Sequence, residues 1–338
     1  MKNSPTLNQW KQLYQYAEKI KELAPWEWMY ESDVFGLSLP EYEENFYVSV
    51  LGNNSEHFAF CILQGDVSLG VFDLLSKDEI EFSGMFFYMT QLQISYEDRE
   101  FCEKKDLEII KKLGLKFRGS NDYPTFRAMH AGYLPYFIDR DEAQVFLDVL
   151  EQSISVVKRF QQDEDLFYEE HPKKFFRVKS ESGEWKDEYL SVPNVVKLHQ
   201  TFRVPQAVVN EIMDKPTREA IVEMEIYIAP FGVNDEEGRP YAPLVFLLVD
   251  KQSGGILNVE LFKPARDFND FLHTTPVNIL NGLNKLKIIP VKYQMSSDFF
   301  FPLFKSLFQK LGLDIELVKN LPNLERAKAS MTSFFASR

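Results

Sequence analysis

A chain of 338 residues is long for one compact domain and comfortable for two, and its hydrophobic share of 45% is enough to fill two cores. A charged share of 26% excludes an intrinsically disordered chain, and the net charge of −13 disfavours nucleic acid and anionic membrane surfaces as partners, because like charges repel at long range. Two cysteines are too few for a disulfide framework, so we expect a reducing, cytoplasmic environment.

Helices and strands alternate along the first half of the chain. Residues 6–24 space their apolar side chains three and four apart, which is typical of an amphipathic helix, and Pro25 ends it. Apolar runs at 46–51 and 58–63 flank a turn rich in Gly and Asn and predict a hairpin. The elements expected after this hairpin are a helix over 66–75, a strand over 92–96, a helix over 97–113 that Gly114 ends, and a helix that Asp139 and Glu142 begin as a capping box.

A charged stretch from Gln161 to about Pro193 separates two units of similar size, and we place the boundary near residue 165. This division predicts an N-terminal α+β domain with a leading helix over residues 1–165 and a C-terminal α+β domain over 166–338. The second domain is expected to open with a hairpin and a helix over 172–215. The elements expected in its core, residues 221–338, are strands over 223–228, 244–249, 256–262, 288–293 and 315–318, and helices over 267–286, 297–311 and from 323 to the end.

Both halves follow the order of three strands and then helix, strand, helix, strand and helix, with the first strand of the first half expected at 35–37. Residues 95–115 and 292–313 both read as strand, loop, helix and Leu-Gly-Leu, so this order predicts an internal duplication. The alternative is that two α+β units share the order by chance, because few connections are available. The order also resembles that of ribonuclease-H-like proteins, which implies for each unit a mixed sheet, antiparallel and then parallel, with helices on both faces.

Active members of the ribonuclease-H-like superfamily gather carboxylates that hold two divalent metal ions. Glu225, on the first strand of the second core, matches one of these acids. The fourth strand ends at Tyr293 and Gln294, without the acid that the chemistry requires. We therefore interpret Glu225 as a vestigial acid and expect no metal ion.

Other patterns point to no catalytic residue and no cofactor. Zinc sites need closely spaced ligands, and the five histidines have no such spacing. These histidines are His57, His130, His171, His199 and His273. The sequence also lacks a nucleophile elbow, a phosphate loop and a dinucleotide-binding glycine motif.

The most distinctive local run is Pro25-Trp26-Glu27-Trp28-Met29. Trp26, Trp28 and Met29 are candidates for a surface that binds a partner, because such side chains are frequent at interaction sites. The alternative, which we favour, is that they close one end of a hydrophobic core.

No stretch approaches the roughly 20 apolar residues that a membrane span needs, and the N-terminus lacks the apolar segment of a signal peptide. The acidic excess lies wholly in residues 1–220, which hold 25 basic and 38 acidic side chains, whereas residues 221–338 hold 13 of each. We therefore expect no membrane partner and regard nucleic acid as a disfavoured one.

Short motifs in both halves resemble those of an uncharacterised bacterial two-domain family. They lie at 24–29, 126–127 and 132–135 in the first half and at 241–250, 255–257, 288–291 and 321–324 in the second. Both domains are known only as domains of unknown function, so the resemblance implies no activity. In the relatives, the first strand of the second domain carries Trp-Glu-x-Asp and the fourth strand ends with an acid. The corresponding residues here are Val222-Glu223-Met224-Glu225 and Tyr293-Gln294, which match those acids only in part.

The leading hypothesis is therefore a non-catalytic protein that binds a partner protein. Two alternatives stay open. One is an enzyme with a site that the sequence does not reveal, such as a degenerate ribonuclease-H-like, metal-dependent nuclease. The other is a nucleic-acid-binding protein.

Overall fold

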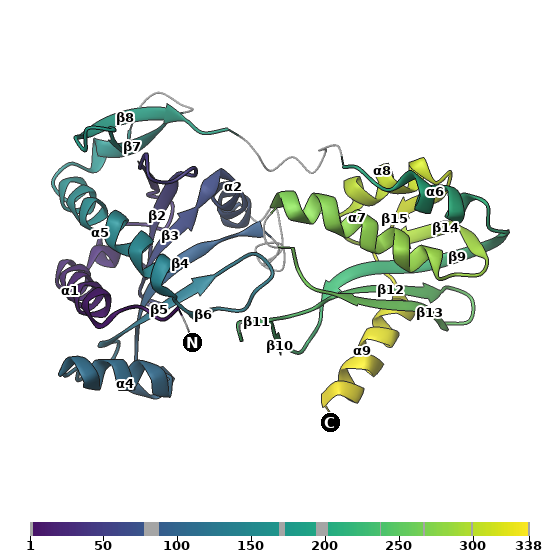
Figure 1. The fold of residues 1–338 in the computed structure, drawn as a ribbon, viewed down its shortest axis with the longest axis horizontal. Coiled ribbons are helices and arrows are strands. Elements are labelled where there is room, and N and C mark those ends of the chain that lie inside the picture. Colours follow the sequence, from purple (N-terminus) through teal and green to yellow (C-terminus); the bar gives the residue numbers. More distant parts are fainter. Residues whose placement is uncertain are drawn as a thin grey trace. The chain divides into compact units, whose positions relative to one another are not determined.

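The computed structural model describes residues 3–77, 88–168, 173–193, 202–236, 238–265, 268–298 and 300–336, with only the backbone for 268–269 and 333–336. The chain forms two compact units. The first takes most of residues 1–195 and the second most of residues 196–338, and each has its own sheet (Figure 1).

The sheet of the first unit is mostly an antiparallel meander. Its strand order is β6-β5-β4-β3-β2-β1-β7-β8, and only β1 and β7 pair in parallel. The strands are β1 (Phe35–Ser38), β2 (Phe46–Leu51), β3 (Ala59–Gln64), β4 (Gln91–Glu97), β5 (Tyr123–Met129), β6 (Tyr136–Phe137), β7 (Lys173–Lys179) and β8 (Trp185–Ser191). Sequential strands are therefore neighbours up to β6, and the last hairpin returns to the free side of β1.

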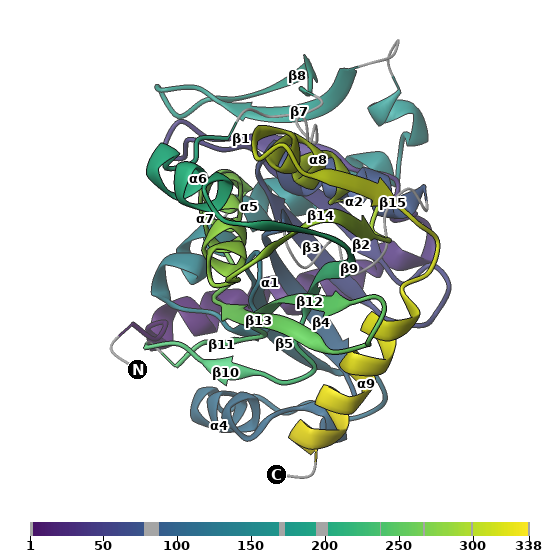
Figure 2. The same ribbon diagram turned by 90° about the vertical axis from the view of Figure 1, so that its right-hand side faces the viewer.

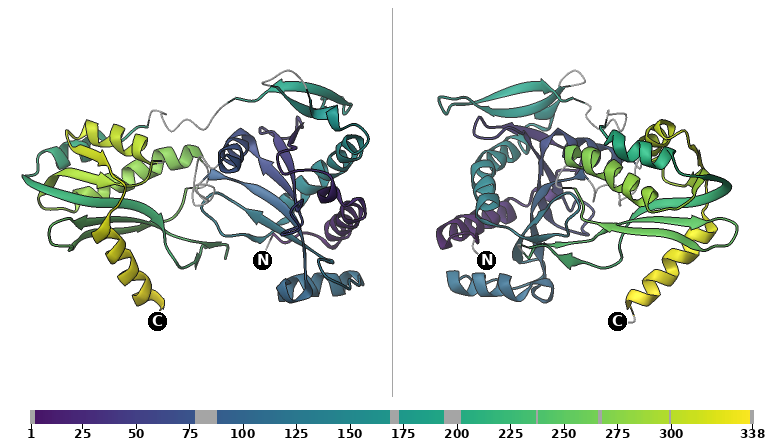
Figure 3. Two further views of the ribbon diagram at one scale, coloured as in Figure 1. Left: turned by 180° about the vertical axis from the view of Figure 1, so that it is seen from behind. Right: turned by 45° about the vertical axis from the view of Figure 1, so that its right-hand side comes forward.

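Helices cover both faces of the first sheet. The long helices α1 (Leu7–Leu23) and α5 (Arg140–Phe160) lie side by side on one face, and the shorter α2 (Gly65–Ser76) lies on the other (Figure 3). Both long helices begin with a capping box, made by Thr6 and Gln9 in α1 and by Asp139 and Glu142 in α5. Helix α4 (Lys104–Leu113) follows β4, and Gly114 ends it in the left-handed conformation with φ 71°.

Alternation along the strands builds the first core. Phe46, Val48 and Val50 of β2 point to α1 and α5 and belong to one buried cluster with residues of both helices. Tyr47 points to the opposite face, where its hydroxyl contacts Asp66 of α2 at 2.5 Å. The strands carry an apolar residue at every second position and the helices one about every 3.6 residues. Both kinds of apolar face are buried in the same core, and the first unit therefore folds as a sheet covered by helices.

The second unit contains a mixed sheet of five strands in the order β13-β12-β9-β14-β15. Strands β12 and β13 are antiparallel to their neighbours, whereas β14 is parallel to both β9 and β15. The strands are β9 (Thr217–Ile228), β12 (Leu244–Asp250), β13 (Ile256–Phe262), β14 (Ile289–Met295) and β15 (Asp314–Leu317), and β10 (Val233–Asn234) and β11 (Pro240–Tyr241) form a separate small ribbon.

Helices α7 (Phe268–Asn284) and α8 (Phe301–Lys310) cover one face of the second sheet, and α9 (Pro322–Ala336) covers the other (Figure 2). Helix α6 (Gln206–Met213) precedes β9 and contacts α7. Phe246 of β12 packs against Phe304 of α8, with ring centroids 6.3 Å apart. Val245 and Leu247 point the other way and share a cluster with Leu324 of α9. All seven residues of β12 are buried, because the strand is covered on both faces.

The prediction of a mixed α/β protein with two sheet-bearing halves is confirmed. The resemblance of the second unit to ribonuclease-H-like proteins stays a prediction. Within the described parts of the chain, no helix is long and apolar enough to cross a membrane.

The expected internal duplication is wrong, because the two sheets differ in topology. After α4, residues 114–122 form a loop of nine residues, which lets the chain run back so that β5 pairs antiparallel with β4. After α8, only residues 311–313 intervene, and β15 pairs parallel with β14. The shared Leu-Gly-Leu therefore marks a similar helix end and not a similar sheet, and the expected antiparallel-then-parallel sheet is absent from the first unit.

The hairpin expected to open the second domain belongs to the first unit instead. Its strand β7 pairs with β1 from Gly36 to Ser38, so β7 and β8 extend the first sheet. Gly36 permits this pairing, since a Cβ there would lie 2.3 Å from a carbon of the Phe176 ring. This pairing could not be predicted from residues 161–193, because strands that are far apart in the chain leave no local signal of their pairing.

Candidate functional site

The outer edge of β13 in the second unit is the candidate site. Among the described residues β13 is the last strand on its side of the sheet and pairs only with β12. Ile256 and Leu261 of this strand are 48% and 51% exposed, whereas the neighbouring β12 is fully buried. A seven-residue edge with exposed apolar side chains is unusual, because such an edge offers its unpaired N–H and C=O groups to another chain.

Polar contacts hold the face of β13 that is turned toward α7. The Asn258 amide donates to the backbone oxygen of Gly282 in α7 at 3.1 Å and to the Glu260 carboxylate at 3.0 Å. Lys285 forms an ion pair with Glu260 at 2.7 Å. On the other face, Val259 packs against the buried cluster that includes Val245 and α9. The strand is therefore anchored on both faces while its outer edge stays open.

A fixed turn leads from β12 into β13. The Asp250 carboxylate accepts hydrogen bonds from the backbone N–H and the hydroxyl of Ser253, both at 2.8 Å, and pairs with Arg218 at 3.0 Å. The backbone hydrogen bond from Ser253, and then its hydroxyl, lower the pKa of Asp250 below its ordinary value. A turn locked in this way presents β13 in an extended conformation before any partner binds.

The opposite edge of the same sheet differs in its chemistry. Strand β15 has four residues, and its exposed positions include Asp314 and Glu316. Short strands and charged side chains are the usual protection of a sheet edge against pairing with other chains. Strand β13 has seven residues, and its exposed positions are Ile256 and Leu261; a β-bulge interrupts it near Ile256, so its regular open edge runs over 257–262.

Glu225, the sequence-predicted acid, forms a structural ion pair. Its carboxylate lies 3.0 Å from the Lys328 ammonium of α9, which also pairs with Glu325 at 3.2 Å. Burial alone would lower the pKa of Lys328, but the neighbouring Glu225 and Glu325 raise it. Over the described residues, no three His, Cys, Asp or Glu side chains come together in a way that could hold a metal ion. His171 and His199 lie outside the described residues.

Glu223, two residues earlier, caps a helix. Its side chain is fully buried and accepts hydrogen bonds from the backbone N–H groups of Asn323 and Leu324, at 2.9 and 2.8 Å. These N–H groups open α9, where a helix end favours negative charge. Glu223 and Glu225 thus both fix α9 to the sheet.

The predicted interaction residues near the start of the chain lie in the first core. Trp26 and Met29 are buried there, and Trp26 packs against Phe58 and Tyr96 with centroids 5.1 Å apart in both pairs. Trp28 is partly buried and stacks on Phe160 at 6.3 Å. Met29 is therefore fully buried, and Trp26 keeps 9% of its surface exposed.

A polar ladder on the first sheet brings together serine, histidine and glutamate. The Gln93 amide donates to the Ser95 hydroxyl at 2.5 Å and lies 3.0 Å from His57 Nε2, while Glu97 lies 3.9 Å from His57 Nδ1. His57 Nε2 is 3.4 Å from the Ser95 hydroxyl. The Gln93 amide is closer to both groups than they are to each other, so Ser95, His57 and Gln93 form one hydrogen-bonded network.

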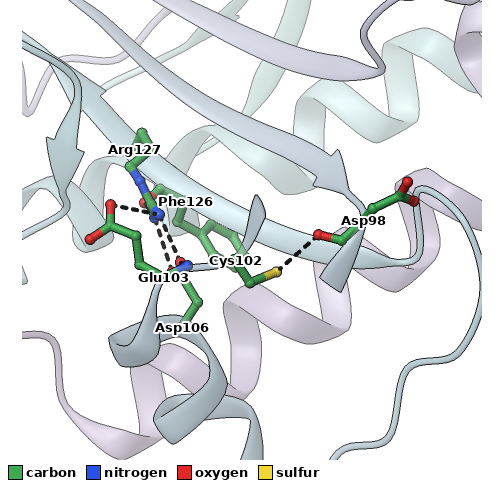
Figure 4. A network of polar contacts seen from close by, with 6 residues as sticks. All are labelled: Asp98, Cys102, Glu103, Asp106, Phe126 and Arg127. Atoms are coloured by element: carbon green, nitrogen blue, oxygen red, sulfur yellow. Dashed lines mark hydrogen bonds and ion pairs between the residues drawn. The ribbon is translucent and has the colours of Figure 1, made fainter. Parts of the chain in front are cut away.

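A second polar network joins α4 to β5 (Figure 4). Arg127 makes a two-pronged pair with Asp106, at 3.0 and 2.7 Å, and a longer contact with Glu103 at 3.4 Å. Asp106 also accepts from the backbone N–H of Glu103, which completes the capping box of α4. The arginine thus fixes the start of a helix, and all of its close partners are structural.

Sequence reasoning missed the β13 edge. It predicted the strand itself over 256–262, but exposure depends on which strand lies outermost, and this order is set by pairings with β9 and β12. A signal was present in the strand: Ile-Leu-Asn-Val-Glu-Leu-Phe places apolar residues at both ends and one polar residue on each side of Val259.

Comparison with known families gives two matches. Residues 10–177 match the model of a domain of unknown function, DUF7309, and residues 208–332 match that of another, DUF6930. No curated protein matches the chain. The first match lies mostly in the first unit and the second match lies in the second unit. The chain thus carries two domains of unknown function, consistent with an uncharacterised two-domain family.

Proposed function

We propose that this protein is a protein-binding module, in which the β13 edge of the second unit accepts an extended segment of a partner by strand addition. The observation that carries the proposal is the exposure of Ile256 and Leu261 on an outermost strand. Strand addition uses backbone hydrogen bonds for affinity and side chains at alternate positions for specificity.

The chemistry of the edge defines the partner segment. Leu257, Val259 and Leu261 alternate along one face, so a segment lying beside them would need apolar side chains at alternate positions. On the other face, Asn258 and Glu260 favour a neutral or hydrogen-bonding side chain at the matching position. The expected partner is thus an extended segment, apolar on one face and polar at the centre of the other.

A library of short displayed peptides, selected on the purified protein, tests the proposal. We expect enriched peptides to alternate apolar residues and to lose binding to Leu261→Lys, because the lysine places a charge beside their apolar side chains. Leu317→Lys is the matched control, since Leu317 is an exposed leucine, 38% accessible, on the opposite edge strand. Equal binding to Leu261→Lys and to the unmodified protein would contradict the proposal.

We also propose a cytoplasmic location. Both thiols are free, and burial, as the largest cause, raises the pKa of Cys61 to about 12 and that of Cys102 to about 11. Such thiols suit a compartment in which cysteines stay reduced. Localisation of the fluorescently tagged full chain tests this proposal, and accumulation outside the cytoplasm would contradict it.

A further inference from the structure

We propose that the segment accepted by β13 is the β13 strand of a second copy of this chain, paired antiparallel about a two-fold axis through Val259. This inference rests on the proposed function and names its partner. Two five-stranded sheets would then join into one continuous sheet, with the same edge used by both copies, as a two-fold interface requires.

The sequence of β13 complements itself in this arrangement. Leu257 lies opposite Leu261 of the second copy, and Val259 lies opposite the Val259 of that copy, so each of these apolar residues meets an apolar residue. Ile256 lies beyond a β-bulge and takes no part in this pattern. Asn258 lies opposite Glu260 of the second copy, so no two like charges face each other. Directly opposite residues of an antiparallel pair share a face of the sheet, so every pair is formed on its proper side.

The two neighbouring registers place the Glu260 carboxylate opposite an unfavourable partner. An axis through Glu260 would place the two Glu260 carboxylates directly opposite each other, and like charges in that position are destabilising. An axis through Asn258 would place Glu260 opposite Ile256. The register centred on Val259 is the one of these three that pairs apolar with apolar residues over 257–261 and keeps each Glu260 away from a second carboxylate and from an apolar partner.

The exposed side chains explain why the second copy suits this edge. The exposed Leu261 meets Leu257 of the second copy, and symmetry forms this contact twice. A single strand pair covers less surface than a standard interface of about 1,600 Å² in total, so we expect a weak dimer with a dissociation constant of roughly micromolar or above.

Sedimentation velocity of the full chain over a concentration series tests the dimer. We expect the unmodified protein to sediment as a monomer–dimer equilibrium, and Leu261→Lys to weaken the dimer at least about tenfold while the control Leu317→Lys leaves it unchanged. A protein that stays monomeric, or a dimer that Leu261→Lys leaves intact, would overturn the inference.

Charge substitutions test the register. Asn258→Glu places two carboxylates opposite each other in the dimer and should weaken it, less so at high salt because charges are screened. Asn258→Glu combined with Glu260→Asn exchanges the two roles and should restore the dimer. Both variants lose the contacts to Gly282 or Lys285, so circular dichroism and the thermal midpoint serve as folding controls.

A disulfide reports the axis directly. Opposite residues in an antiparallel pair have Cα atoms roughly 4.5–5.5 Å apart, within the range of a disulfide. Val259→Cys should therefore form an oxidised dimer under mild oxidation, whereas Leu317→Cys should not. A dimer that resists this cross-link would place the axis elsewhere and refute the register.

Peptide binding separates the two proposals. A monomeric protein that still binds the selected peptides at β13 retains the proposed function and loses this inference. A monomeric protein that binds no peptide contradicts both. A dimer that competes with the peptides, and that Leu261→Lys abolishes, supports both.

Discussion

Replacement of Glu223 should release α9 from the second sheet. The carboxylate is fully buried and accepts two backbone hydrogen bonds of 2.9 and 2.8 Å at the start of this helix. Glu223→Ala leaves both N–H groups without an acceptor, at about 1–3 kcal/mol for each, partly offset because a buried charge is also removed. We expect a net loss of about 2–4 kcal/mol in the free energy of unfolding of the second unit. Glu223→Gln retains an acceptor oxygen and loses the charge, so it should cost about 1–2 kcal/mol.

Urea unfolding followed by two probes measures this loss, since a chain of two units need not unfold in one step. All four tryptophans lie in the first unit, at 10, 26, 28 and 185, so their fluorescence reports that unit. Hydrogen exchange of the α9 backbone reports the second unit. The protection of α9 should be highest in the unmodified protein, lower in Glu223→Gln and lowest in Glu223→Ala. Glu219→Gln, an exposed position on the same strand, is the control.

The outcome that refutes this reasoning is specific. If Glu223→Ala costs less than about 1 kcal/mol, the two hydrogen bonds do not stabilise α9 in the way that their geometry implies. If Gln costs as much as Ala, the charge and not the number of acceptors determines the stability.

Three further predictions follow from the buried polar groups. Asp106→Asn should cost the first unit about 1–3 kcal/mol, because it removes a buried carboxylate that pairs with the half-buried Arg127 guanidinium, and a lower urea midpoint of tryptophan fluorescence would reveal it. Glu225→Gln should lower the pKa of Lys328 and cost about 1–2 kcal/mol, measured by lysine NMR titration and urea unfolding; an unchanged titration would contradict the pairing. Burial raises the pKa of Cys61 to about 12 from an ordinary 9.0, so the neutral thiol stabilises the fold fully below pH 9 and this stabilisation is lost as the pH rises towards 12. Alkylation of Cys61 at pH 8 should therefore be slow in the folded protein and rapid in urea, and equal rates in both would be inconsistent with its burial.

Local signals predicted most of the elements, because caps, turns and periodicity are written within a few residues. Asp139 and Glu142 predicted the start of α5, and the Gly- and Asn-rich turn predicted the hairpin of β2 and β3. The expected helix over 97–113 was partly wrong, since a short 3₁₀ turn, Arg99–Phe101, precedes α4 at Lys104.

Pairings between distant residues could not be predicted. Glu225 and Lys328 are 103 residues apart, and β1 joins β7 across more than 130 residues. The role of an acid depends on which helix end or cation the fold brings to it. Glu223 and Glu225 alternate with buried apolar residues on one strand, and nothing in that alternation distinguishes a metal ligand from a helix cap.

The parallel pairing of β1 with β7 bears on how this protein can be divided. A fragment that stops at residue 165 would lose both strands of the last hairpin and leave Phe35, Gly36 and Leu37, all buried in the whole chain, along an open side of the sheet. The matched family segment ends at residue 177, inside β7 itself. A fragment intended to be soluble and independently folded should therefore extend past Ser191, beyond the limit that family boundaries would recommend.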